Sequence, residues 1–193
     1  MGRRIVDVTL DNLPEAPDEV RGTLYWELDA AGTSVDPVFE KEEWFSEVLL
    51  EWGTCGKLAV DEDRGSVGFA EYAPPGFFPR LNEFRAGKVS ADAVYLSYCY
   101  VVAPRRGFGL GTELVRTVAR DLVDRGFEAL EAIGDHQAGE GWVLPASFLT
   151  MNGFRVIRED SRFPLMRLDL RTVAEPQPAT TAAAVPLPAP EPA

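Results

Sequence analysis

The chain is poor in the residues that build metal centres and disulfide frameworks. Among its 193 residues there are two cysteines, Cys55 and Cys99, and a single histidine, His136. A zinc site needs about four nitrogen or sulfur ligands, and these residues lack the spacing of such a site. We therefore expect no metal site and no structural disulfide, and we interpret both cysteines as small buried hydrophobic residues.

Long apolar runs and an excess of cations are also missing. No apolar stretch approaches the roughly 20 residues that cross a bilayer. The alternating start, Ile5-Val6-Asp7-Val8, is typical of a strand and not of a secretion signal. A formal net charge of −12 argues against nucleic acid as a partner, because phosphate would be repelled. We expect a cytoplasmic protein without membrane or nucleic-acid partners, whose charge would attract a cationic acceptor such as an amine.

The composition changes near Val173. Residues 173–193 consist mostly of alanine, proline, threonine and glutamate, a composition that blocks helices and sheet ladders and offers little apolar surface to bury. Residues 1–172 belong to a chain with 46% apolar residues, enough to bury a core. The sequence thus predicts one folded domain at 1–172 and a disordered tail at 173–193.

Apolar periodicity within the domain predicts a mixed α/β (α+β) fold. The segment 77–91, rich in proline, glycine and aromatic residues, is expected to be a loop, either an acceptor lid or a surface excursion that covers the core. Expected strands are 4–10, 57–61, 66–72, 93–102, 127–133, 154–157 and 165–170, and expected helices are 18–28, 36–53, 112–126 and 145–152.

A glycine-rich turn joins the buried strand 93–102 to the helix that follows it. A turn of this kind places unpaired backbone N–H groups at a positive helix end, where phosphate binds readily. Gly109 and Gly111 lack Cβ, so the backbone can approach an anion closely, and Arg105 and Arg106 add positive charge. The turn therefore predicts a phosphate-bearing ligand.

Two common nucleotide motifs do not fit this turn. A Walker A loop requires a lysine that is missing here, and the third glycine of the dinucleotide fingerprint would fall on Thr112 or Leu114. Arg106, Gly109 and Gly111 instead satisfy the pattern Arg/Gln-x-x-Gly-x-Gly/Ala. The turn thereby resembles the pyrophosphate loop of the Gcn5-related N-acetyltransferase (GNAT) superfamily.

The resemblance extends from 93 to 154. Residues 95–102 resemble the family's fourth strand, which splays from its neighbour and offers backbone groups to the pantetheine arm, and 148–154 resemble the closing helix and its terminal Gly-Phe. The resemblance implies a central twisted mixed sheet flanked by helices. It also implies acetyl-CoA or another short acyl-CoA as cofactor, bound by Val101, Val102, Arg106, Gly107, Phe108, Gly109, Leu110, Gly111 and Thr112.

The sequence departs from the family pattern at several positions. Leu149 stands where many relatives carry a tyrosine, Trp142 where an asparagine is common, and Tyr98 where the fourth strand often has a glutamate. A proline usual before the motif arginine lies one place nearer, as Pro104. The resemblance thus supports cofactor binding and leaves the acid–base groups open.

Direct attack of an amine on the thioester needs no protein nucleophile, but it needs a base, an acid and a donor for the acyl oxygen. The backbone N–H of Val101 or Val102 is our candidate donor by resemblance. Cys99 has no histidine or aspartate at a recognisable spacing, which argues against an acyl-cysteine. Candidate bases are Glu71, Glu131, Asp135 and His136, and candidate acids are Tyr98 and Tyr100.

The sequence therefore predicts an acyl-CoA-dependent N-acetyltransferase that acts on a primary amine of a small molecule or a protein. The alternative is a catalytically quiet acyl-CoA-binding sensor or interaction module, which Leu149 favours. Both functions leave a homodimer open.

Overall fold

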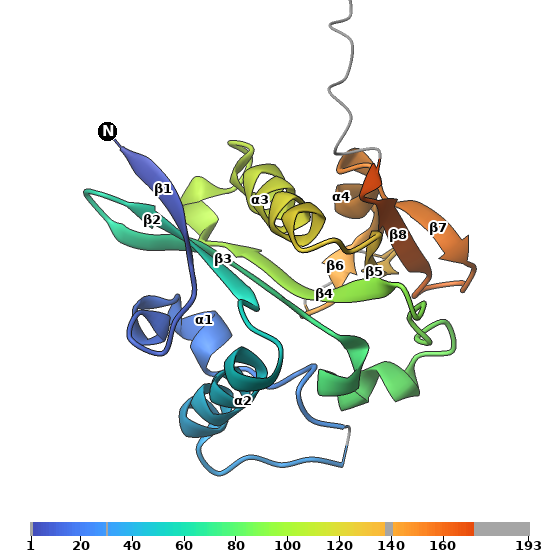
Figure 1. The fold of residues 1–193 in the computed structure, drawn as a ribbon, viewed down its shortest axis with the longest axis horizontal. Helices are drawn as coiled ribbons and strands as arrows, with labels where there is room; N and C mark the ends of the chain where they lie inside the picture. Colours follow the sequence, from blue (N-terminus) through green and yellow to red (C-terminus); the bar gives the residue numbers. More distant parts are fainter. Residues whose placement is uncertain (1, 30, 138–140, 172–193) are drawn as a thin grey trace, which may run out of the picture.

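The computed structural model describes residues 2–29, 31–137 and 141–171 (Figure 1). The tail predicted at 173–193 lies outside these residues. The centre of the molecule is an eight-stranded mixed sheet in which β6 (Leu144–Pro145) pairs with β5 beside the main path. Along that path the strands are β1 (Arg3–Asp7), β2 (Gly56–Asp61), β3 (Gly65–Ala73), β4 (Ala93–Val101), β5 (Ala129–Asp135), β8 (Leu165–Asp169) and β7 (Arg155–Arg158).

The pairing of β4 with β5 positions the site. The two strands run parallel, and their register covers only Ala93–Tyr95 against Ala129–Glu131. Beyond Tyr95, β4 continues along β3, whereas β5 pairs with β6 and β8. The sheet therefore opens between β4 and β5, as the resemblance of residues 95–102 to a splayed strand implies.

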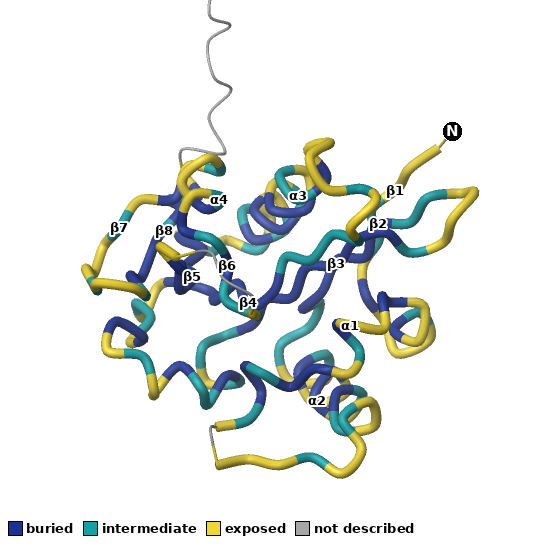
Figure 2. Tube along the Cα trace, turned by 180° about the vertical axis from the view of Figure 1, so that it is seen from behind, coloured by how far each residue is buried: buried dark blue, intermediate teal, exposed yellow. Residues whose placement is uncertain are grey.

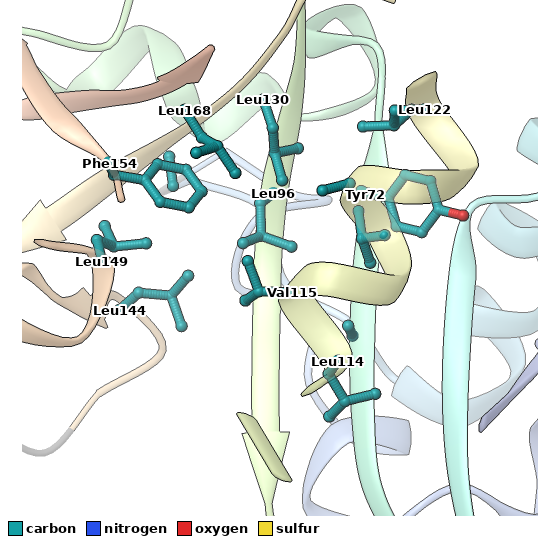
Figure 3. Packing of buried hydrophobic residues seen from close by; sticks show 14 of the residues in the cluster. Tyr72, Leu96, Leu114, Val115, Leu122, Leu130, Leu144, Leu149, Phe154 and Leu168 are labelled. Carbon is teal, nitrogen blue, oxygen red and sulfur yellow. The ribbon is translucent and has the colours of Figure 1, made fainter. Parts of the chain in front are cut away.

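Helices cover both faces of the sheet (Figure 1). On one face lie α3 (Leu110–Asp124) and α4 (Ala146–Met151), and on the other α1 (Asp18–Arg21) and α2 (Pro37–Glu51). Leu110, Leu114, Val118 and Leu122 recur at helical spacing and form the buried side of α3. Figure 3 shows Leu96 of β4 beside Val115 of α3, within a core that also receives side chains from α4. This arrangement confirms the predicted mixed sheet flanked by helices.

The opposite face is packed with aromatic side chains. Trp44 of α2 contacts Phe45 and Phe78, and Phe78 in turn packs against Tyr95 of β4. Helix α2 begins where the sequence predicts, because the Asp36 carboxylate accepts a hydrogen bond from the Phe39 N–H at 3.2 Å. Figure 2 shows that the sheet interior is buried while the outer sides of the helices are exposed.

The helix predicted at 18–28 is wrong beyond Arg21. Gly22 ends α1, and tertiary contacts take over the following backbone: the Trp26 N–H donates to the Glu27 carboxylate at 3.0 Å and to the Tyr98 hydroxyl at 3.3 Å. Side-chain oxygens thereby replace the carbonyl acceptor that a continuing helix would supply.

The segment 77–91 contains more regular structure than the expected loop. It includes the end of one 3₁₀ helix, Pro75–Phe77, and a second, Pro79–Glu83. Phe78 and Leu81 are buried, and Phe84 packs against Trp26. These contacts favour the interpretation of the segment as a cover over the core. Within the described residues, no helix is both long and apolar enough to cross a bilayer.

Candidate active site

The opening between β4 and β5 forms a cavity of about 510 Å³. Its walls come from the carboxyl-terminal half of β4, from Arg106 in the turn that follows, and from the segment between β5 and α4. The lining residues are Tyr98, Cys99, Tyr100, Val101, Arg106, Gly141, Trp142, Val143, Leu144 and Pro145.

A bulge in β4 decides which side chains face each side of this cavity. Tyr72 pairs with Leu96 and Glu71 with Tyr98, so Ser97 has no counterpart on β3. The extra residue shifts the alternation of the strand. Leu96 therefore packs toward α3, whereas Tyr98, two residues on, packs toward α2.

The shifted alternation gives the cavity two chemically different walls. Cys99 and Val101 join the core on the α3 side, and Tyr100 packs with Trp142 on the α2 side. The cavity therefore connects the two faces of the sheet at the place where β4 and β5 separate. A ligand on the α3 side can meet a second ligand on the α2 side without crossing the closed part of the sheet.

The predicted glycine turn lies at the α3 end of this cavity. Gly107 and Gly109 have φ angles of +81° and +80°, and the space where their Cβ atoms would stand holds no atom within 4 Å. Both positions favour glycine for their backbone conformation, and the surface above them is open. The Glu113 N–H bonds to the Gly109 carbonyl at 3.0 Å, and the amides of Leu110, Gly111 and Thr112 precede it as the first-turn donors of α3. The turn thus fits a phosphate group.

Gly111 is glycine for a different reason than the sequence suggests. A Cβ at this position would stand 3.1 Å from the ring of Phe148 and 3.9 Å from the Cys99 sulfur. The missing side chain lets α3 pack against α4 and β4. Its steric role is therefore interior packing, although its amide belongs to the first turn of the helix.

The two arginines of the turn differ in their partners. Arg106 lines the cavity, donates from Nε to the Val101 carbonyl at 2.8 Å, and lies 5.5 Å from the centre of the Tyr100 ring. Arg105 forms an ion pair with Asp61 on β2. Arg106 is therefore the arginine that can reach a ligand lying in the cavity.

The backbone of β4 distinguishes the two candidate N–H donors. The Val102 N–H donates to the Val67 carbonyl of β3 at 3.1 Å. Because successive residues of an antiparallel strand point their N–H groups to opposite edges, the N–H of Val101 points away from β3 and toward the opening. Val101 is therefore the candidate that the geometry favours.

Tyr98, Tyr100 and Trp142 form the wall on the α2 side. The Trp142 ring lies 5.6 Å from that of Tyr98 and 6.4 Å from that of Tyr100. Burial raises the pKa of both tyrosines, and the nearby Glu19 of α1 raises that of Tyr100 further. Both hydroxyls are therefore neutral near pH 7 and able to donate a proton. Trp142 appears in the sequence only as a departure from the family pattern.

None of the four candidate bases lines the cavity. Glu71 is fully buried on β3, with one oxygen 2.7 Å from Lys41 Nζ. Glu131 is fully buried on β5, where it accepts hydrogen bonds of 2.9 Å from Arg167 and from the Ser90 N–H. Asp135 ends β5 and accepts from the Gln137 N–H at 2.9 Å, and His136 follows it as an exposed residue.

Leu149 contributes to packing rather than to the cavity. Its side chain is fully buried in the core between α3 and α4, close to Phe154 in Figure 3. Two residues of the α2 side, Glu27 and Lys41, approach the site and were missed by sequence reasoning. They lie far apart in the sequence from Tyr98 and from each other, and no short motif connects them.

Comparisons with known proteins agree with this geometry. Structures of similar fold include the Paia N-acetyltransferase of Thermoplasma acidophilum in complex with coenzyme A, with 18% identity, 88% of this chain and 99% of that chain covered, and a TM-score of 0.54. The putative acetyltransferase yncA of Salmonella typhimurium, solved with its cofactor acetyl-CoA, has 16% identity, covers 88% and 95%, and has a TM-score of 0.59. Arylalkylamine N-acetyltransferase 2 of Aedes aegypti has 12% identity, covers 88% and 100%, and has a TM-score of 0.57.

Sequence comparison gives the family directly. No curated protein matches the chain significantly. The model of the acetyltransferase (GNAT) family matches residues 23–139, a range that includes β2 to β5, the glycine turn and α3. The chain belongs to the acetyltransferase (GNAT) family.

Proposed function

We propose that this protein binds acetyl-CoA, or another short acyl-CoA, and transfers the acyl group to a primary amine. The observation that carries this proposal is the cavity that connects the two faces of the sheet, with a phosphate-type turn on one side and an aromatic wall on the other. Two substrates could meet there, one from each face, as direct transfer requires.

On the α3 side, the residues fit the cofactor. The first-turn amides of α3 and the guanidinium of Arg106 would hold the pyrophosphate, and Cys99, Val101 and Leu144 would line the arm. Two structures of similar fold contain coenzyme A or acetyl-CoA, which supports this assignment. When bound, acetyl-CoA supplies the acetyl group as a thioester. The Val101 N–H is the donor that we assign to the acyl oxygen.

On the α2 side, the residues suit a cationic amine. Ammonium groups are attracted to the faces of Tyr and Trp rings, and Tyr98, Tyr100 and Trp142 present such rings to the cavity. The net charge of −12 would raise the local concentration of cations. Tyr100 lines the cavity next to Cys99 and Val101, which would contact the cofactor arm, so we assign to its hydroxyl the delivery of a proton to the CoA sulfur.

A second candidate function is a catalytically quiet acyl-CoA-binding module. It is favoured by Leu149, because this residue lies in the core where many relatives carry the tyrosine that protonates the thiolate. A module of this kind would use the turn and the α3 wall but not the tyrosines. A cytoplasmic location stays a prediction for either function.

Transfer can be tested by mixing the purified chain with acetyl-CoA and one of several primary amines, such as benzylamine, cadaverine and Nα-acetyl-lysine amide. Release of free CoA thiol and the mass of the product are measured together. We expect amine-dependent thiol release and a product that carries one acetyl group. If the chain binds CoA tightly but transfers the acetyl group to none of these amines, the enzyme function is rejected in favour of the acyl-CoA-binding module.

A further inference from the structure

Three charged side chains are buried behind the aromatic wall. Lys41 of α2 forms ion pairs with Glu27 and with Glu71 of β3, the latter at 2.7 Å. The exposed fractions of the three side chains are only 1%, 2% and 0%. Buried ion pairs are costly to form, so a cluster of this kind calls for an explanation beyond stability. We refer to Glu27, Lys41 and Glu71 as the buried charge cluster.

Tyr98 connects this cluster to the cavity. Tyr98 lines the cavity and its ring packs against Trp142, while its hydroxyl donates to the Glu27 carboxylate at 3.1 Å and accepts from the Trp26 N–H at 3.3 Å. The Lys41 ammonium lies 4.5 Å from the centre of the same ring. A hydrogen-bonded path therefore leads from a cavity wall to a buried carboxylate.

The charges of the cluster do not balance. Two carboxylates face one ammonium, which leaves one unbalanced negative charge when all three groups are ionised. The Ser97 hydroxyl donates to Glu71 at 2.8 Å, and Cys55 also faces the cluster. Neither group carries a charge there, since burial raises the pKa of the Cys55 thiol. A buried negative charge without a counterion is unfavourable, so the cluster has an affinity for a proton.

The titration of the individual groups agrees with this balance. Burial and then repulsion from Glu27 raise the pKa of Glu71 well above its usual value. Burial alone would lower the pKa of Lys41, but the two carboxylates raise it, so the ammonium stays charged. Glu71, which interacts closely with Glu27 and Lys41, therefore binds a proton more readily than a surface carboxylate does.

We propose that the buried charge cluster is the proton acceptor of the transfer reaction and that Tyr98 links it to the acceptor amine. This inference rests on the proposed function. An N–H bond of the ammonium breaks, its proton moves to the Tyr98 oxygen, and the Tyr98 proton moves to the Glu27 carboxylate. The electron pair stays on nitrogen, which becomes the nucleophile. The reaction releases one proton overall, and this proton later passes from Glu27 back through Tyr98 to water.

Within this path, Tyr98 is the group that touches the amine. Glu27 acts through Tyr98, and Lys41 and Glu71 act through Glu27, so these three are positioning residues. They hold the Glu27 carboxylate in place against the Tyr98 hydroxyl in a buried environment.

The chain contains a matched control for this arrangement. The Tyr72 hydroxyl donates to Asp121 at 2.9 Å, and Lys57 donates to the same carboxylate at 3.0 Å. This trio has the same three types of group, but it lies between β2, β3 and the end of α3 and does not line the cavity. We expect Asp121→Asn to change stability and to leave transfer unaffected.

The test compares Glu27→Gln, Tyr98→Phe, their double variant and Asp121→Asn with the parent chain. The amine is the best acceptor among benzylamine, cadaverine and Nα-acetyl-lysine amide. Two quantities are measured: kcat at saturating amine across the pH range in which the proteins stay folded, and the CoA affinity by calorimetry. The pH dependence of kcat reports the groups that titrate in the complex with both substrates.

We expect the kcat of the parent to fall at low pH, because a cluster that already holds a proton cannot accept another. Glu27→Gln leaves one carboxylate for one ammonium, so the charges of the cluster balance and it no longer accepts a proton. We therefore expect kcat to fall by roughly 10²–10⁴-fold. The pH profile of kcat should also no longer show the decrease at low pH that the parent shows. Tyr98→Phe should have the same effect, and the double variant should be no worse than either single change, since the groups act as a unit. CoA affinity should not change.

Other results would overturn the inference. If Glu27→Gln keeps the pH profile of the parent and a kcat within a few-fold, and loses only stability as Asp121→Asn does, the cluster is structural. If Glu27→Gln does not fold, Tyr98→Phe decides alone, because it removes one hydroxyl and keeps the ring. An inactive parent would overturn the proposed function and this inference together, whereas an active parent with unaffected variants would overturn the inference alone.

Discussion

Gly109 and Gly111 are two residues apart and meet different physical requirements. Gly109 has a positive φ angle and open space above it, whereas a side chain on Gly111 would press against Phe148. The motif pattern predicts both glycines but not this division, because a sequence shows which residue lacks a Cβ and not what the Cβ would meet. The distinction matters for experiments, since only Gly109 can be changed without disturbing the packing between α3 and α4.

Replacing Gly109 with alanine should weaken CoA binding by about tenfold or more, because the methyl group enters the space where the phosphate would lie. Gly126 is the matched control. It has the same φ of +80° at the other end of α3, and no atom lies within 4 Å of its Cβ position. Both variants should lose about 1–2 kcal/mol of stability, but only Gly109→Ala should bind CoA more weakly in calorimetry. Equal CoA affinity in both variants would contradict the assigned phosphate site.

Cys99 is the one thiol that lines the cavity, within the part of the chain that the structure describes. Burial raises the pKa of this thiol to about 12, so it stays protonated at neutral pH and is a poor nucleophile. Cys99→Ala should therefore keep kcat within a few-fold. The intact mass of the parent, recorded with acetyl-CoA and no amine, should show no acetyl adduct. An adduct that disappears in Cys99→Ala would instead indicate an acyl-cysteine.

Among the elements, β4 carries most of the functional arrangement. The sequence predicts this strand, the glycine turn and α3 closely, because each has a strong local signal: a run of β-branched and aromatic residues, glycines at motif spacing, and apolar residues at helical spacing. The bulge at Ser97 has no such signal. It reverses the side to which Tyr98 points, so the sequence identifies this tyrosine without showing where its hydroxyl lies.

Long-range contacts explain what sequence reasoning missed. The helix predicted at 18–28 stops at Arg21, because Trp26 and Glu27 bind the Tyr98 hydroxyl and the core instead of the helical backbone. Glu71 is a candidate base in the sequence because it is a carboxylate near a strand end that could face the acceptor. Its pairing with Lys41, which sets its environment, depends on how α2 packs on β3 and has no local trace in the sequence.

The segment between β5 and α4 contributes Trp142 to the amine wall, and its role can be tested separately. Trp142→Leu should raise the KM for the amine by about 2–30-fold, the equivalent of about 0.5–2 kcal/mol of cation–π attraction, and leave CoA affinity unchanged. Trp52→Leu is the control, because Trp52 packs against Arg125 and Phe127 away from the cavity. If both variants raise the KM equally, the effect is a general loss of packing.

At the scale of the whole molecule, the net charge of −12 should guide cationic acceptors to the cavity. Electrostatic attraction is screened over about 10 Å at 0.1 M salt and over shorter distances at higher salt. The kcat/KM for an amine should therefore fall as salt is added, and more steeply for the dication cadaverine than for benzylamine. Measurements with both amines at matched ionic strengths check this. Equal salt dependence would limit the role of the charge to solubility.

The central claim is that acetyl-CoA and an amine meet in one cavity that crosses the sheet, and that the acyl group passes directly between them. Initial rates of thiol release, measured while both substrates are varied, test this claim most directly. Direct transfer requires both substrates to be bound at once, so the double-reciprocal lines should intersect. Parallel lines would indicate an acyl-enzyme intermediate, and thiol release that does not depend on amine would show that the amine is not the acceptor.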